Sequence, residues 1–161
     1  MNNNKLLAFI SLVLSLSIIF AGTNVYAETT FEKIKRTGKV TVGTEAAFPP
    51  FEFVEDGKIV GYGKDILDYI IADMGVELNQ LDLPWQGILP GVLAGKFDFV
   101  ATSVSIRAER AKKYAFTVPI AEGTNWVMKR SGDSSIMSPD DLSGKVVCTQ
   151  LASGSEKATK E

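Results

Sequence analysis

Residues 96–110 read KFDFVATSVSIRAER, an apolar run that passes without a break into hydroxyl side chains and then arginines. The FDFVA part is too continuously apolar for a strand with one wet face. It predicts a strand that is covered on both faces, as parallel strands are. Strand signals alternate with helix signals in the rest of the chain, and this order predicts an α/β fold with a mainly parallel sheet.

The elements around this stretch follow from caps, turns and periodicity. A capping box formed by Thr29 and Glu32 predicts a helix that ends at Gly38. Helical spacing of Leu67, Ile70, Ile71 and Met74 predicts a helix over 64–75 that packs these residues in the core. The predicted elements, in chain order, are a helix over 29–37, a strand over 39–44, an irregular loop over 45–51, a hairpin over 51–62 around Asp56–Gly57, the helix over 64–75, a strand over 78–83, a short helix over 85–95 with Pro90 near its start, the strand over 96–102, a helix over 108–116, a strand over 123–130, a capped turn at 138–142, a strand over 145–150 and the first turns of a helix after 153.

Composition excludes several classes of function. The 161 residues are 45% hydrophobic and 22% charged, which is typical of a globular protein. The net charge of −2 argues against a nucleic-acid partner. The chain has no histidine and its single cysteine is Cys148, so His/Cys metal sites, His-based catalytic triads and an internal disulfide are excluded. We expect no metal and no cofactor.

The first 27 residues predict a signal peptide. Lys5 precedes a long apolar run, and the segment ends in VYA, so we expect cleavage after Ala27 and a soluble protein in the periplasm. The alternative is an uncleaved anchor, because the run approaches the roughly 20 residues of a membrane-spanning helix. Cys148 lies far from the cleavage site and cannot accept a lipid there.

Three loops follow predicted parallel strands, at 45–51, 84–87 and 102–107, and the carboxyl ends of such strands form the usual ligand site. Ser103, Ser105 and Arg110 together predict a socket for a carboxylate, held by a guanidinium fork and hydroxyls. The alternatives are a solvated arginine and hydroxyls that cap a turn. Arg107 is either a second anion contact or a residue on the rim.

Two aromatic residues and one acid lie in the other two loops. Phe48 and Trp85 each stand beside proline and either flank a ligand side chain or belong to the core. Glu45 either holds an ammonium group or is a surface acid at a turn.

Six segments occur in one order and spacing: VGTEAAFPPFEF, GYGKDIL, WQGILPGVLAGKFDFV, SVSIRAER, YAFTVPI and LSGKVV. With them the chain resembles the extracytoplasmic solute-binding proteins of amino-acid ABC importers, family 3. The resemblance implies two α/β lobes that close like a hinged trap on one amino acid. It also implies a monomer that presents this cargo to a membrane permease and performs no chemistry.

The resemblance implies domain bounds as well. Residues 28–122 correspond to most of lobe one, and 123–161 correspond to a hinge strand and the beginning of lobe two. Family members continue for roughly another hundred residues, so we expect a C-terminally truncated chain in which residues 28–161 bind a ligand weakly or not at all.

The resemblance also implies which residues of this chain correspond to the ligand-binding positions of the family. Arg110 matches the arginine that pairs with the α-carboxylate of the ligand, with Ser103 and Ser105 beside it. Phe48 and Trp85 match the aromatic positions that flank the ligand side chain. The remaining two matches are Glu45, at an often acidic position, and Ser153, the hydroxyl of the second lobe. The chain departs from the family pattern at Gly63, Arg107, Ala152 and Gly154.

Other functions occur on the same fold. A periplasmic cyclohexadienyl dehydratase-like enzyme needs a general acid, for which Glu45 or Glu122 would have to serve. A ligand-sensing input domain would keep a membrane-spanning segment. A non-amino-acid anion such as sulfate would leave the flanking aromatic residues without a role.

Overall fold

The computed structural model describes residues 27–160, so all of the predicted signal peptide except Ala27 lies outside the described residues. The chain divides into two units, one ending at Lys33 and the other beginning at Ile34. In the first unit the predicted capping box is present: the Thr29 hydroxyl accepts the Glu32 N–H at 3.2 Å, and the Glu32 carboxylate accepts the Thr29 N–H at 2.8 Å. These hydrogen bonds lower the pKa of Glu32. Within residues 27–160 no helix is long and apolar enough to cross a membrane.

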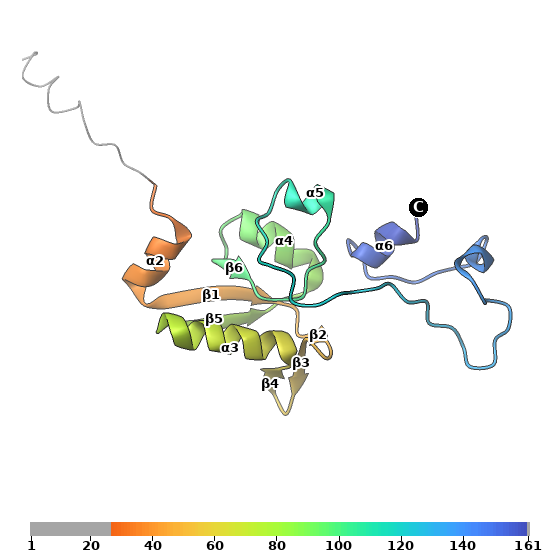
Figure 1. Cartoon of the computed structure of the whole chain (residues 1–161), viewed down its shortest axis with the longest axis horizontal. Helices are drawn as coiled ribbons and strands as arrows, with labels where there is room; N and C mark the ends of the chain where they lie inside the picture. Colours follow the sequence, from red (N-terminus) through yellow and green to blue (C-terminus); the bar gives the residue numbers. More distant parts are fainter. Residues whose placement is uncertain (1–26, 161) are drawn as a thin grey trace, which may run out of the picture. The chain divides into compact units, whose positions relative to one another are not determined.

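The described residues form an α/β fold, as predicted (Figure 1). A parallel sheet has the strand order β5-β1-β6, and a small antiparallel sheet has the order β2-β3-β4. The elements are α2 (Thr30–Thr37), β1 (Lys39–Thr44), β2 (Ala47–Phe48), β3 (Glu52–Glu55), β4 (Lys58–Val60), α3 (Tyr62–Met74), β5 (Glu77–Asp82), α4 (Trp85–Leu93), β6 (Phe99–Val100), α5 (Ala108–Ala111), the 3₁₀ helix η1 (Pro139–Leu142) and α6 (Gly154–Ala158).

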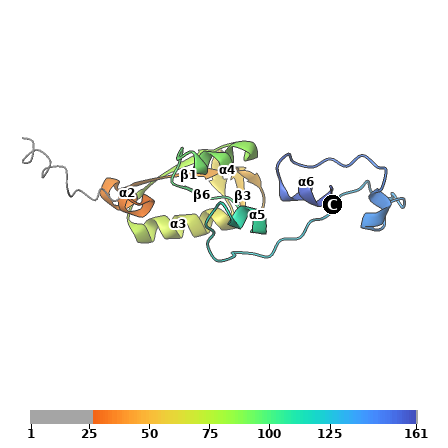
Figure 2. The same cartoon turned by 90° about the horizontal axis from the view of Figure 1, so that it is seen from above.

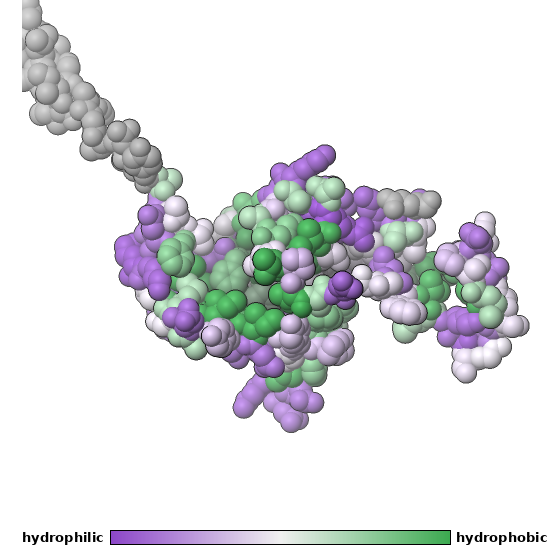
Figure 3. Space-filling model, in the orientation of Figure 1, coloured by the Kyte–Doolittle hydropathy of each residue, from purple (hydrophilic) through white to green (hydrophobic). Residues whose placement is uncertain are grey.

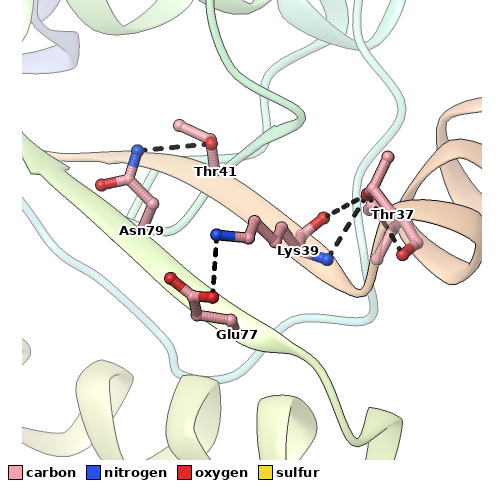
Figure 4. A network of polar contacts seen from close by, with 6 residues as sticks. Thr37, Lys39, Thr41, Glu77 and Asn79 are labelled. Atoms are coloured by element: carbon pink, nitrogen blue, oxygen red, sulfur yellow. Dashed lines mark hydrogen bonds and ion pairs between the residues drawn. The ribbon is translucent and has the colours of Figure 1, made fainter.

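The register of the parallel sheet is fixed along the whole of β1. It pairs with β5 from Lys39 opposite Glu77 to Thr44 opposite Asp82. Figure 4 shows the polar contacts on this pair: the Lys39 ammonium lies 3.0 Å from the Glu77 carboxylate, and the amide of Asn79 donates to the Thr41 hydroxyl at 3.4 Å. The Lys39–Glu77 pair is exposed, so it adds little stability beyond marking the register.

The core lies on both faces of β1, and Figure 2 shows α3 and α4 on opposite sides of the sheet. Val40 and Val42 are fully buried and cluster with Leu67 and Ile71 of α3. On the other face the ring of Phe97 fills the space over a glycine. β1 is therefore covered on both faces, whereas β6, the strand for which this was predicted, consists of Phe99 and Val100 and is half-buried.

That glycine is Gly43, and a second glycine, Gly91 of α4, faces the same ring. A Cβ at either position would lie 2.6 Å from an atom of the Phe97 ring. Real Cβ atoms do not approach so closely, so the sheet and α4 pack at this distance only because both residues are glycine.

The hairpin is confirmed, because Asp56 and Gly57 both have positive φ (49° and 73°), as the two-residue turn of a hairpin requires.

Three expectations were wrong in detail. The loop over 45–51 contains the short strand β2, which pairs with β3. Pro90 is the sixth residue of α4 rather than near its start, so the helix gives up one backbone hydrogen bond. Ile70 is 42% exposed because α3 buries only the stripe of Leu67 and Ile71.

The strands expected over 123–130 and 145–150 are absent from the described residues. Trp126 and Val146 are 86% and 96% exposed. A strand needs a neighbouring strand for its backbone donors and acceptors, and residues 27–160 provide no partner for either segment. The capped turn is confirmed as η1, in which Ser138 and Asp141 form a capping box. The helix expected after Ser153 is α6.

Candidate functional site

The carboxyl ends of the parallel strands lie at one edge of the sheet. The Leu83 N–H donates to the Thr44 carbonyl at 2.8 Å, and the Thr44 hydroxyl donates to the Ala101 carbonyl at 2.8 Å. The Asp82 carboxylate accepts the Ala46 N–H at 2.9 Å. These bonds tie the loops that follow β1, β5 and β6 to one another, so the sequence prediction that these loops adjoin is confirmed.

Trp85 and Arg110 lie together at this edge. Trp85 is the first residue of α4 and only 8% exposed. The guanidinium carbon of Arg110 lies 5.4 Å from the centre of its ring, which is a cation–π distance. Burial and, after it, the charge of Arg107 lower the pKa of Arg110. An arginine nevertheless stays charged at neutral pH. The ring therefore belongs to the core and also supports the guanidinium.

Both arginines donate to main-chain carbonyls. Arg110 donates to the carbonyl of Ser105 at 3.2 Å and to that of Ala152 at 3.4 Å. Arg107 donates to the carbonyl of Gly154 at 3.0 Å. Arg107 is half-buried, whereas the side chain of Ser105 is exposed. The segment around α6 is thus tied to the loop that follows β6.

Ser103 is held by an acid that the sequence did not predict as part of the site. Glu52 is 2% exposed, and its carboxylate accepts the Ser103 N–H at 3.1 Å, the Ser103 hydroxyl at 2.9 Å and the Thr102 hydroxyl at 3.3 Å. Burial raises the pKa of Glu52, and the hydrogen bonds from Ser103 and Thr102 oppose that rise. The Ser103 hydroxyl donates its proton inside the protein and retains only its lone pairs for a ligand.

A glycine is the sequence signal that could have found Glu52. A Cβ at Gly63 would collide with Oε1 of the Glu52 carboxylate. An acid at position 63 would also bring a second carboxylate close to that of Glu52, and the two would repel each other. The sequence by itself shows that the chain departs from the family pattern at Gly63, but it does not show that Glu52 is the neighbour of this glycine.

The structure does not bring Phe48 and Trp85 into ring contact. Phe48 is half-exposed and stacks on Phe51, with ring centres 5.5 Å apart and planes 15° apart. Phe51 in turn meets Tyr62 edge-on at 6.2 Å. Among residues 27–160, the ring partner of Phe48 is therefore Phe51, and the three rings form a small aromatic cluster beside the hairpin.

Glu45 and Ser153 have partners of their own. Oε1 of Glu45 accepts the side-chain amide of Gln150 at 2.6 Å, so this acid is tied to a residue distant in sequence. The Ser153 hydroxyl accepts the Glu156 N–H at 3.1 Å and caps α6. Ser153 and Arg110 both line a hollow near α6.

A hollow of about 410 Å³ lies between the α5 region and α6. Such a volume is typical of a small-molecule site. Its lining is mostly charged: Arg107, Glu109, Arg110, Ala152, Ser153, Glu156, Lys157 and Lys160. Figure 3 shows hydrophilic residues gathered around α5 in the orientation of Figure 1. Among the described residues no group of three or more His, Cys, Asp or Glu side chains could hold a metal ion.

Residues 40–159 match the family described as bacterial extracellular solute-binding proteins, family 3. The L-cystine-binding protein TcyJ of Escherichia coli (strain K12) is 33% identical over 127 residues, which cover 78% of this chain and 48% of that protein. The chain spans about half the length of the curated relatives it matches.

Two solved structures are similar as well. The ancestral amino acid-binding protein AncCDT-1, a precursor of cyclohexadienyl dehydratase, superposes with a TM-score of 0.75 at 32% identity, over 82% of this chain and 60% of that one. The arginine-bound form of domain 1 from TmArgBP, from T. maritima, superposes with a TM-score of 0.52 at 41% identity, over 54% of this chain and 70% of that one.

Proposed function

The chain belongs to the bacterial extracellular solute-binding proteins, family 3, and we propose that it binds a free amino acid in the hollow beside Arg110. The observation that carries this proposal is the guanidinium of Arg110, which lies over the buried Trp85 ring at the carboxyl edge of the sheet. A planar fork held in place by an aromatic ring is suited to grip a carboxylate with two parallel hydrogen bonds.

The α-carboxylate of the ligand would take the place of main-chain carbonyls. Arg110 donates to the carbonyls of Ser105 and Ala152 at 3.2 and 3.4 Å, which are long for charge-assisted bonds. A carboxylate would accept from the same N–H groups at shorter distance, because its negative charge is the better acceptor. The backbone N–H of Ser105, on the same loop, would donate to the carboxylate, whereas the lone pairs of Ser103, whose proton goes to Glu52, would accept from the ligand's ammonium group.

The remaining site residues would act around this anchor. Trp85 would present an edge of its ring to the ligand, and Phe48, half-exposed on the Phe51 ring, would cover the ligand side chain. Ser153 would approach the carboxylate from the other side of the hollow, and Glu45 would meet the ammonium group after release of Gln150.

We propose that residues 28–122 form one lobe of a hinged trap, with 123–161 forming the hinge and the beginning of a second lobe. The bonds from Arg107 and Arg110 to Gly154 and Ala152 are of the kind that would hold two such parts together around a ligand. The whole protein would be exported to the periplasm by the segment over 1–27 and would present its cargo, as a monomer, to the permease of an ABC importer.

A binding role fits the site better than catalysis. Of the two residues that catalysis would need as a general acid, Glu122 is exposed, and neither it nor Glu45 belongs to the lining of the hollow. The matched relatives are named for the amino acids they bind, and AncCDT-1 is itself called an amino acid-binding protein.

The test is a calorimetric titration of residues 28–161 with a panel of amino acids. One solved domain 1 of a relative is an arginine-bound form, so we expect measurable, weak binding by this chain. Arg110→Ala should abolish it, while Arg130→Ala, which removes an exposed arginine away from the hollow, should leave it unchanged. Equal affinities for the two variants would contradict the proposal.

A further inference from the structure

Two guanidinium groups in the hollow have no carboxylate among their hydrogen-bond or ion-pair partners within residues 27–160. Arg107 and Arg110 both line the hollow, and each is half-buried. Within residues 27–160 their hydrogen-bond acceptors are the carbonyls of Ser105, Ala152 and Gly154. A carbonyl satisfies an N–H group but carries no net charge, so two positive charges remain close together. Their proximity is also seen in the pKa of Arg110, which the charge of Arg107 lowers in addition to the effect of burial.

The other charges of the hollow are largely neutralised in pairs. Lys157 lies 3.1 Å from the Glu109 carboxylate, and Lys160 lies 2.6 Å from the Glu156 carboxylate. The second carboxylate oxygen of Glu156 accepts the Ala152 N–H at 2.6 Å. Hydrogen bonds from its own backbone N–H and from Lys157 lower the pKa of Glu109, and the charges of Lys157 and Arg107 add to this effect. The Glu109 charge also acts on Arg110, but the ion pair of Glu109 is with Lys157. The two lysines of the hollow are thus ion-paired, whereas the two arginines are not.

Arg107 also has a place reserved for it. A Cβ at residue 154 would lie 2.8 Å from the guanidinium carbon of Arg107 and closer still to its terminal nitrogen. With an alanine at this position the flexible Arg107 side chain would have to move its guanidinium group away. Gly154 supplies the carbonyl that Arg107 uses as well, so the two residues form one unit.

Resting on the proposed function, we propose that Arg107 determines specificity: with Arg110 it selects a dicarboxylic amino acid, such as glutamate, over neutral and cationic amino acids. Arg110 binds the α-carboxylate and Arg107 binds the second carboxylate, so that two anionic groups offset two cations. An amino acid with a cationic side chain would add a third positive charge to the same hollow. A neutral side chain would leave Arg107 without a counter-charge.

The experiment compares glutamate with glutamine, which differ by a carboxylate and an amide of nearly the same shape. Calorimetric titration of residues 28–161 should show roughly ten- to a hundredfold tighter binding of glutamate, as expected for one charged hydrogen-bonded contact. In Arg107→Met the glutamate affinity should fall by that factor, and the glutamine affinity should not change. Arg130→Met is the matched control, and it should retain the preference.

A second variant tests the same contact without touching the arginine. Gly154→Ala places a Cβ in the space of the Arg107 guanidinium, so it should reduce the glutamate preference in the same way. A purely structural role of either residue would weaken both ligands equally, and that result overturns the inference. Equal affinity of the unmodified chain for glutamate and glutamine overturns it too, while leaving the proposed function intact. If no amino acid binds at all, the proposed function fails together with it.

Discussion

Replacing Glu52 by glutamine should change how the stability of this protein depends on pH. Glu52 is 2% exposed, and burial raises its pKa above the ordinary glutamate value of 4.5. An acid whose pKa is higher in the folded state binds its proton more tightly there than in the unfolded chain. Its contribution to the free energy of unfolding is therefore complete below pH 4.5 and is lost as pH rises through the folded pKa. Glutamine does not titrate, so this loss is absent from the variant.

The size of the effect at low pH follows from the contacts of the carboxylate. Three donors reach it: the N–H and hydroxyl of Ser103 and the hydroxyl of Thr102. An amide can accept the Ser103 N–H and donate to a hydroxyl, so Glu52→Gln should cost about 1 kcal/mol at pH 4 or below. Glu52→Ala leaves the Ser103 N–H without an acceptor and opens a small cavity, which should cost about 2–4 kcal/mol there. Both costs should decrease as pH rises, because the unmodified chain then loses stability.

Urea unfolding at a series of pH values from 4 to 8, followed by circular dichroism, gives the free energy for each chain. Exposed acids with a lowered pKa, such as Glu32, Asp133 and Asp141, change the free energy of unfolding with pH in the opposite direction. Both chains contain these acids, so their contribution cancels when the free energy of Glu52→Gln is subtracted from that of the unmodified chain. A matched control is Glu55→Gln, which removes an exposed acid of the same strand. The reasoning is refuted if Glu52→Gln and the unmodified chain show the same dependence on pH.

Three further changes test the packing around the site. Gly43→Ala should destabilise the fold by about 1–3 kcal/mol, because the new Cβ would lie 2.6 Å from the Phe97 ring. The same substitution should cost less in a chain that also carries Phe97→Leu. Urea unfolding of the chains with and without Gly43→Ala, in each background, measures the two costs. Trp85→Ala should cost about 3–5 kcal/mol in thermal or urea unfolding, because the ring is 8% exposed; a cost below 1 kcal/mol would contradict its place in the core. Ser153→Ala removes the acceptor of the Glu156 N–H and should destabilise α6 by about 1 kcal/mol. Faster exchange of the amide hydrogens of α6 would show this loss.

The features that could be predicted from the sequence are those set by neighbours along the chain. The capping box at Thr29, the turn at Asp56–Gly57 and the cap of η1 at Ser138 each depend on side chains within a few residues of the backbone they satisfy. The parallel sheet was predictable because strand signals alternate with helix signals and the run over 97–101 is apolar except for Asp98. That the loops after β1, β5 and β6 adjoin then followed from the geometry of parallel strands.

Long-range contacts explain the predictions that were wrong or missing. Apolar composition alone indicated strands over 123–130 and 145–150, but a strand also needs a partner, and residues 27–160 provide none. Helical spacing placed Ile70 in the core, yet only the neighbours of α3 decide how wide its buried stripe is. In each of these cases the deciding atoms belong to another part of the chain.

In the candidate site, too, some features could be predicted from the sequence and others depend on long-range contacts. Residue type and position were enough to single out Arg110, Trp85 and Ser103, because guanidinium, indole and hydroxyl groups at strand ends are suited to a carboxylate ligand. Only the tertiary structure decided that Glu52 holds Ser103 and that Arg107 occupies the space left by Gly154. Glu52 and Ser103 are 51 positions apart in the sequence, and Arg107 and Gly154 are 47 positions apart. At such separations the folding of the chain decides which atoms meet, because no local sequence pattern connects them.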